Sequence, residues 1–356
     1  MLSFAGSAPC RTRGNFPSVS INGNGIIVEA HQPSSSSTTM YYQIGTIHRD
    51  DVNFYEERVI VGTGKYPNVA INDNNRVVEV HEGARSHTRQ VYYNVGLLEN
   101  QRIQWQCMPI LLSPGAFPAI AVCGNRVVVT HDKALFRYST YYHVGTINEG
   151  GTAIEWGEKR ALFEGSVINQ TAVAINDESA IAIGRGWFHI VCRVGRFPNR
   201  EARNIDWFNE ISLDDHVGIC PKICLDDGGC TIMVWHSRVL KQLTYTEGEI
   251  KQNDGQWVVE WQESRNYDNG TRPAIAITPN SGKVVEEHET NFGSTLHIHV
   301  GRYDRQLERR QNGENGDPAD QRQEPQQSGH DEEQLGGEWN MQCETKTFLN
   351  RMITFR

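Results

Sequence analysis

The chain has 356 residues, of which 38% are hydrophobic and 22% charged, with a formal net charge of −9 and a pI of about 5.8. This composition is typical of a globular protein, and the negative charge argues against a nucleic-acid partner, which would favour a basic face. The sequence holds no run of about 18 apolar residues, so we expect no membrane-spanning helix.

The start of the chain, Met1 to Gly6, lacks the charged and apolar segments of a secretory leader. We therefore expect a cytoplasmic protein, with secretion left open because a leader could be missing from this sequence. The eight cysteines share no position within the repeat described next, which favours free thiols over a disulfide framework.

A unit of roughly fifty residues recurs along the first 300 residues. Each unit starts with Gly-x-x-Pro, continues with a β-branched run ending in histidine, and closes with Tyr-Tyr-x-Val-Gly or a relative of it. In the first unit these segments begin at Gly14, Ile26 and Tyr41. The proline position of the six units is occupied by Pro17, Pro67, Pro118, Thr171, Pro221 and Pro273. The fourth unit is degenerate, with Thr171 in place of proline and Arg185 roughly where histidine stands elsewhere.

The segments within each unit have the pattern of short strands. Pro-x-Val-x-Ile alternates, the run before the histidine is β-branched, and Asn-Asp or Asn-Gly marks the turn between them. A fourth segment ends on an aromatic residue in five units: Phe54, Trp105, Trp156, Trp207 and Trp261. The sequence therefore predicts an all-β protein, a six-bladed β-propeller with four-stranded antiparallel blades.

Spacing also predicts how the ring closes. Phe4 precedes Pro17 by 13 residues, the same interval that separates Phe54 from Pro67. We expect the N-terminal strand to complete the sixth blade, because that unit loses the pattern after Gly301. The alternative is that residues 338–340 return to supply the strand after a long excursion.

Composition changes after the last unit. We expect residues 1–303 to form the propeller and residues 304–337, rich in Arg, Gln, Glu, Asp and Gly, to be disordered. Residues 338–356 regain apolar character at helical spacing and form a short C-terminal segment, helical or docked on the propeller.

Strand direction places the Gly-x-x-Pro loops and the repeated histidines on one face of the disc. The candidate ligand-binding residues are Glu29, His31, Glu79, His81, His131, His236, Glu286 and His288. Two interpretations are open: the histidines hold neighbouring loops or blades together, or the Glu-x-His pairs bind the hydroxyl groups of a sugar.

Other chemistry is less visible. His297 and His299 share one face of a strand, but two ligands do not make a metal site, and the spacing of Cys220, Cys224 and Cys230 is not that of a zinc site. We predict no metal, no cofactor and no catalytic residue, because the notable polar residues follow the repeat instead of breaking it.

The fifty-residue period, the four-strand unit and the closing aromatic resemble lectin propellers with six blades and, more loosely, fucose-lectin and sialidase-type repeats. The Ser-x-Asp-x-Gly-x-x-Trp box of sialidase repeats is absent, so no family residue is carried over. The resemblance implies a lectin-like, non-enzymatic recognition protein, a monomer that binds a glycan. The alternatives are a protein-binding scaffold of the WD-repeat kind and a glycoside hydrolase-like propeller enzyme.

Overall fold

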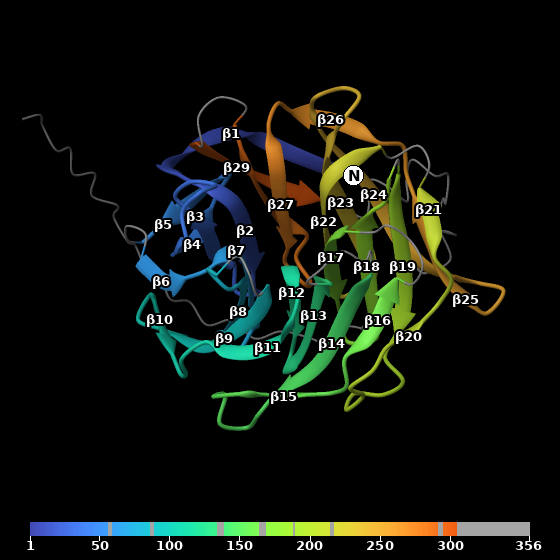
Figure 1. Cartoon of the computed structure of the whole chain (residues 1–356). Helices are drawn as coiled ribbons and strands as arrows, with labels where there is room; N and C mark the ends of the chain where they lie inside the picture. The colour runs from blue at the N-terminus through green and yellow to red at the C-terminus, as the bar shows by residue number, and fades with distance from the viewer. Residues whose placement is uncertain are drawn as a thin grey trace, which may run out of the picture. The chain divides into compact units, whose positions relative to one another are not determined.

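The computed structural model describes residues 1–55, 59–85, 89–133, 139–163, 169–187, 189–213, 217–290 and 295–304. These residues form six antiparallel sheets arranged as blades around one axis, so the predicted six-bladed β-propeller is confirmed (Figure 1). No helix in these ranges has the length and apolarity to cross a membrane. The predictions for residues 305–356 lie outside the described part of the chain.

The strands follow the chain in blade order. Blade 1 contains β2 (Asn15–Ile21), β3 (Ile26–Gln32), β4 (Thr39–His48), β5 (Asp51–Phe54) and β6 (Val59–Thr63). Blade 2 contains β7 (Lys65–Ile71), β8 (Arg76–Glu82), β9 (Gln90–Glu99), β10 (Arg102–Trp105) and β11 (Ile110–Pro114). Blade 3 contains β12 (Ala116–Cys123), β13 (Arg126–Asp132), β14 (Thr140–Ile147), β15 (Ile154–Trp156) and β16 (Arg160–Phe163).

The second half of the ring repeats this order. Blade 4 contains β17 (Asn169–Ile175), β18 (Ser179–Arg185), β19 (Ile190–Arg196), β20 (Asp206–Trp207) and β21 (Ile211–Leu213). Blade 5 contains β22 (Gly218–Leu225), β23 (Cys230–Ser237), β24 (Leu243–Asn253), β25 (Gln256–Trp261) and β26 (Arg265–Asp268). Blade 6 contains β27 (Thr271–Ile277), β28 (Lys283–Glu289), β29 (Thr295–Tyr303) and, from the other end of the chain, β1 (Leu2–Arg13).

The outer edge of the first five blades is split into two short strands. In blade 1 both β5 and β6 pair with β4, one after the other, and the same arrangement recurs in blades 2 to 5. The expected fourth strand is therefore followed by a short fifth one, which leads the chain back to the axis of the propeller.

The ring is closed by the N-terminal strand. β1 pairs antiparallel with β29, and the blue start of the chain lies beside the orange β29 in Figure 1. Phe4 faces Gly301 across this ladder just as Phe54 faces Gly45 in blade 1. The prediction of closure by the N-terminal strand is confirmed.

Six apolar clusters hold the blades together, one at each junction between neighbours. Buried asparagines add polar links where the first strand of a blade turns into the second. Asn22 Nδ2 donates to the Asn72 carbonyl, and Asn72 Nδ2 donates to the Gly124 carbonyl in the next blade. Each asparagine also caps its own turn through Oδ1, so one side chain satisfies buried backbone groups of two blades.

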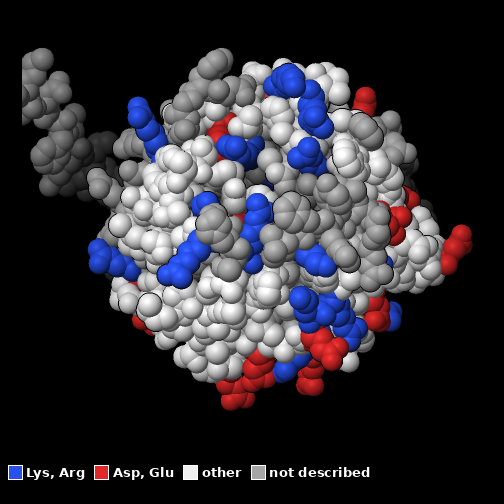
Figure 2. Space-filling view, in the orientation of Figure 1, with Lys and Arg blue, Asp and Glu red and all other residues white. Residues whose placement is uncertain are grey.

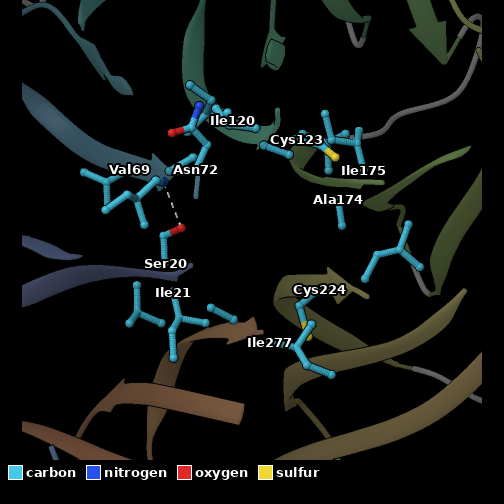
Figure 3. A pocket seen from close by; sticks show the side chains of 18 of the residues that line it. Ser20, Ile21, Val69, Asn72, Ile120, Cys123, Ala174, Ile175, Cys224 and Ile277 are labelled. Atoms are coloured by element: carbon cyan, nitrogen blue, oxygen red, sulfur yellow. Dashed lines mark hydrogen bonds between the residues drawn. The ribbon is translucent and has the colours of Figure 1, made fainter. Parts of the chain in front are cut away.

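The innermost strands β2, β7, β12, β17, β22 and β27 enclose a channel of about 350 Å³ on the axis. Ile21, Ile120 and Ile175 are among the side chains that line it (Figure 3). Ser20 and Ser18 also bridge blades here, because their hydroxyls accept hydrogen bonds from Ile71 and Val69. The channel is thus lined by both apolar and polar groups, and hydrogen bonds between blades cross its wall.

Candidate functional site

The predicted Glu-x-His pairs lie inside the blades. Glu29, His31, Glu79, Glu286 and His288 have 0% exposure, and His81 has 2%. A ring nitrogen, Nδ1, lies 2.8 Å from Glu29 in His31, 3.0 Å from Glu79 in His81 and 3.1 Å from Glu286 in His288. These side chains are paired with each other and covered, and a direct role for them in ligand binding stays a prediction.

The repeated glycine and the repeated histidine pack against each other, and the contact leaves no room for a side chain at the glycine. A Cβ on Gly14 would lie 2.7 Å from Cδ2 of His31, and one on Gly64 would lie 2.4 Å from Cδ2 of His81. The imidazole therefore occupies the place that any larger residue at the glycine would need. This packing fixes the loop that leads into the innermost strand of blades 1, 2, 3 and 6.

The histidine ring is less regular than the sequence suggested. His131 is fully buried but stacks on His143, with 3.2 Å between their Nε2 atoms, because Val129 stands where a glutamate would be. In blade 5 Trp235 occupies the buried histidine position, and His236, one residue further, bonds the Gly270 carbonyl of blade 6 through Nδ1.

The fourth blade shows a similar shift of one residue. Asn169 pairs with Arg185, as Asn15 pairs with Gln32 in blade 1. Gly184, and not Arg185, therefore stands at the histidine position of this blade. In blade 4 the shift follows from a shorter turn, because four residues lie between the paired Ile175 and Ala180 where blade 1 has five between Ile21 and Ile27.

A ring of six left-handed residues surrounds one mouth of the channel. They occupy the position just before the repeated proline or Thr171, have φ between 48° and 56°, and line a shared hollow: Phe16, Tyr66, Phe117, Gln170, Cys220 and Arg272. Each follows an irregularity in the pairing of its innermost strand, such as that between Asn15 and Ser18. A β-bulge redirects the side chain that it carries, and here it directs six of them to the axis.

Each of the six residues in this ring has a strained backbone conformation. A left-handed backbone is unfavourable for bulky residues and costs on the order of 1–3 kcal/mol where the surroundings enforce it. In five blades a side chain of the preceding blade accepts the hydrogen bond of the strained amide, and in blade 5 the acceptor for Cys220 is Gln170 Oε1 at 3.3 Å. The other acceptors are Glu289 for Phe16 at 2.7 Å, Gln32 for Tyr66 at 2.8 Å, Glu82 for Phe117 at 3.4 Å and Asp132 for Gln170 at 3.2 Å.

The mouth has one aromatic half and one polar half. Phe16, Tyr66 and Phe117 come from blades 1 to 3, and their ring centroids are 4.6 Å and 4.5 Å apart in succession. Gln170, Cys220 and Arg272 come from blades 4 to 6. The Arg272 guanidinium lies 4.4 Å from the Phe16 centroid and donates to Glu289, so it joins the two halves.

Burial changes the pKa values of two carboxyl groups behind the mouth, those of Asp132 and Glu82. It raises the pKa of Asp132 to about 7, with the hydrogen bond from Gln170 acting in the opposite direction, and it also raises the pKa of Glu82 against the charge of Arg89. Among the described residues none hydrogen-bonds Asp132 Oδ1. In the face seen in Figure 2, lysine and arginine side chains lie around the centre and most visible acids lie near the edge.

No family model matches the sequence, and no curated protein matches it either. Solved structures do resemble the fold. A Trypanosoma rangeli sialidase is 10% identical with a TM-score of 0.53, covering 87% of this chain and 61% of its own. A Penicillium chrysogenum alpha-L-arabinanase complexed with arabinobiose is 9% identical with a TM-score of 0.55, covering 84% and 98%. The chain thus spans about 61% of the length of the sialidase.

These neighbours correct one expectation. We predicted a protein without enzymatic activity, and this is contradicted because the similar propellers are named as sialidases and an arabinanase. At this identity the likeness shows the fold alone. An activity of this chain is therefore a matter for proposal.

The sequence analysis missed the residues of the mouth. Their signal was present, since Phe16, Tyr66 and Phe117 stand at the same place before proline in three units. We interpreted the glycine and the proline of this motif and passed over the residue between them. The polar half could not be found in this way, because Gln170, Cys220 and Arg272 share no residue type.

Proposed function

We propose that this propeller binds a carbohydrate at the channel mouth. The observation that carries the proposal is the division of the mouth into three neighbouring aromatic rings on one side and the polar Gln170 and Arg272, with Cys220 between them, on the other. A sugar ring has the same division, because its carbon-bound hydrogens form apolar faces and its hydroxyls project from the edge.

The aromatic half supplies stacking. The faces of Phe16, Tyr66 and Phe117 carry partial negative charge, and they attract the slightly positive carbon-bound hydrogens of a sugar face. These rings are half-buried, which leaves part of their surface for a ligand. The hydrogen bonds to Glu289, Gln32 and Glu82 fix the backbone beneath them, so little ordering is needed on binding.

The polar half supplies orientation. Gln170 offers an amide and Arg272 offers guanidinium donors at the side of the mouth opposite the rings. A few placed polar groups beside an apolar wall are typical of small-molecule sites. Because the six residues converge on the axis, the proposal is for one site per chain, not one site per blade.

A glycan array probed with the full chain tests this proposal. We expect Phe117→Ala and Tyr66→Ala to weaken binding of the glycans that wild type retains by about fivefold or more, if stacking of a sugar contributes as much as the roughly 1–3 kcal/mol of a base stacked on an aromatic ring. Tyr55→Ala is the matched control, because Tyr55 is an exposed aromatic outside the mouth. Binding that survives both mouth variants, or is lost equally in the control, would refute the site.

Turnover of the bound glycan is the second candidate. Burial raises the pKa of Asp132 to about 7, so this carboxyl group is partly protonated near neutral pH, and the charge of Glu82 in the adjacent blade also raises its pKa. Two carboxyl groups with different proton affinities are what glycoside hydrolysis uses. Release of reducing sugar from a retained glycan, abolished in Asp132→Asn, would support hydrolysis; intact glycan after prolonged incubation would leave binding alone.

A further inference from the structure

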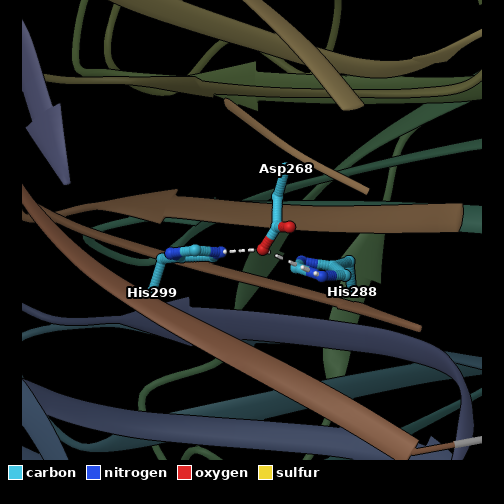
Figure 4. A group of neighbouring side chains, drawn as sticks. All are labelled: Asp268, His288 and His299. Atoms are coloured by element: carbon cyan, nitrogen blue, oxygen red, sulfur yellow. Dashed lines mark hydrogen bonds and ion pairs between the residues drawn. The ribbon is translucent and has the colours of Figure 1, made fainter. Parts of the chain in front are cut away.

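Three potential metal ligands meet between blades 5 and 6. Asp268 ends β26 of blade 5, while His288 and His299 lie on β28 and β29 of blade 6. Figure 4 shows the carboxylate between the two imidazoles. Asp268 Oδ2 lies 2.9 Å from His299 Nε2 and 3.7 Å from His288 Nε2, and all three donor atoms lie within 4.8 Å of one another.

The orientation of His288 is fixed from behind. Its Nδ1 lies 3.1 Å from Glu286 Oε2, and Glu286 Oε1 accepts a hydrogen bond from the Tyr267 hydroxyl at 2.8 Å. His288 is completely buried, and among the described residues none hydrogen-bonds its Nε2. The Nε2 atom is therefore held toward the Asp268 carboxylate, which is an ion-pair partner at 3.7 Å and lies beyond hydrogen-bond distance.

This arrangement departs from the repeat. The ladder places Gly62, Ser113, Phe163 and Leu213 of blades 1 to 4 where Asp268 stands in blade 5. The position of His299 is Gln43 in blade 1 and Asn94 in blade 2. Blade 1 repeats the Glu-x-His pair without the other two ligands, so the pair alone accounts for the ordinary blade, and Asp268 and His299 need a separate reason.

We propose that Asp268, His288 and His299 bind a divalent transition-metal ion, with Zn²⁺ as the best fit. Two imidazoles and one carboxylate are a recurrent zinc set, and a tetrahedral zinc ion places its ligand atoms about 3.3 Å apart. Two of the three separations here, 2.9 Å and 3.7 Å, are already near that value. Glu286 acts as the outer partner that orients a metal-bound histidine.

The ion would lie where the ring closes. His299 packs against Phe4 of β1, with 5.3 Å between ring centroids, and Asp268 belongs to the neighbouring blade. A metal ion here would tie blade 5 to the closing blade. Three protein ligands leave a fourth position for water, on the side where Asp268 is 25% exposed.

Zinc titration of the full chain tests the proposal. Protein freed of metal with a chelator is titrated with ZnCl₂ in a calorimeter, and we expect one ion per chain. His299→Gln and Asp268→Ser copy residues that blades 1 and 2 already carry, so the variants are expected to fold. Each should weaken zinc binding by at least about tenfold, since even outer-shell changes cost 10–100-fold.

His143→Gln is the matched control. It removes the histidine that occupies the His299 position in blade 3, where Phe163 stands at the place of Asp268, and it should leave zinc affinity unchanged. Wild-type protein that takes up no zinc would overturn the proposal. So would uptake that His299→Gln and Asp268→Ser do not change, because the zinc would then sit elsewhere, for example on thiols. Glycan binding at the mouth is a separate measurement, so either proposal can fail alone.

Discussion

Phe4 lies directly across from Gly301 in the ladder that joins the two ends of the propeller. The glycine is required by this contact, because a Cβ at residue 301 would lie 2.8 Å from the Ser3 carbonyl oxygen and 2.9 Å from Phe4 Cδ1. The same pairing of glycine and aromatic occurs inside the other blades, for instance between Gly96 and Trp105. The ring is therefore closed by the same glycine–aromatic pair that occurs within the other blades, with its two residues coming from distant parts of the chain.

Gly301→Ala should lower the stability of the closed ring. The added methyl group meets backbone, which can yield only if β1 moves away from β29, so we expect a loss of about 1–3 kcal/mol as in other overpacked sites. Gly62→Ala is the control, because a Cβ at Gly62 meets no atom within 4 Å. Urea unfolding of both variants measures the difference. Equal stability of the two variants would contradict a tight contact at the closure.

The fold could be predicted because the same short motifs recur along the sequence at a regular interval. Gly-x-x-Pro, the β-branched run and the closing aromatic recur six times or nearly so, and Phe4 keeps their spacing although it is far from Gly301. Free thiols were also expected, and the cysteines described between Cys107 and Cys230 are free. The short fifth strand was missed, because a segment such as Val59–Thr63 has no repeated residue to mark it.

The left-handed backbone of Tyr66 gives a second prediction. At its φ of 54° alanine suffers the clash of its Cβ with the backbone, about 1–2 kcal/mol, while glycine does not. Tyr66→Gly should therefore be as stable as Tyr66→Ala or more stable, although glycine is normally the worse residue in a strand.

The neighbouring position provides the reference for this comparison. Lys65 has an ordinary φ, so Lys65→Gly should be less stable than Lys65→Ala by roughly 0.5–1 kcal/mol. Urea midpoints of the four variants decide the matter. The same order at both positions would show that residue 66 is not strained.

The site was harder to predict than the fold for physical reasons. A positive φ at a phenylalanine or tyrosine leaves no trace in residue type, because it is imposed by the bulge and by the acceptor in the preceding blade. The cluster around Asp268 is assembled across a blade junction from a strand with no repeated motif. His299 was visible as half of a His-x-His pair, but its partners could not be assigned without the register.

Asp132 makes the free energy of unfolding depend on pH between about pH 4 and pH 7. Its pKa is about 7 in the folded protein, raised chiefly by burial, and about 3.9 when unfolded. The folded state therefore binds the extra proton between these values, and stability falls as pH rises from about 4 to 7, with a slope of up to about 1.4 kcal/mol per pH unit. Gln170, Arg89 and Glu82 are the groups that act on this carboxyl group.

Asp132→Asn should remove that slope. The asparagine side chain keeps an oxygen that can accept the hydrogen bond from the Gln170 backbone N–H. The stability of the variant relative to wild type should therefore increase steadily as pH rises toward 7. Asp51→Asn removes an exposed carboxyl group of β5 and controls for the change in net charge. Thermal unfolding at several pH values gives the comparison. Parallel curves for wild type and Asp132→Asn would show that the carboxyl group is ionised like any other.

The buried pair of His131 and His143 acts in the opposite direction. The pKa of His131 is lowered to about 4 and that of His143 to about 3, chiefly by burial, and the charge of Lys159 acts in the same direction on both. Unfolded histidine takes up a proton near pH 6.5, so the stability that these neutral rings allow is present above that pH and is lost as pH falls toward 4.

His143→Gln should remove about half of this acid sensitivity. Glutamine already occupies the corresponding place in blade 1, so the fold should accept it, and one histidine instead of two then titrates on unfolding. Between pH 6.5 and 4 the stability of the variant should fall less steeply by up to about 1.4 kcal/mol per pH unit. His48→Gln, at an exposed end of β4, should follow wild type. If His143→Gln also follows wild type, the buried pair is already protonated when folded, and the acid sensitivity arises elsewhere.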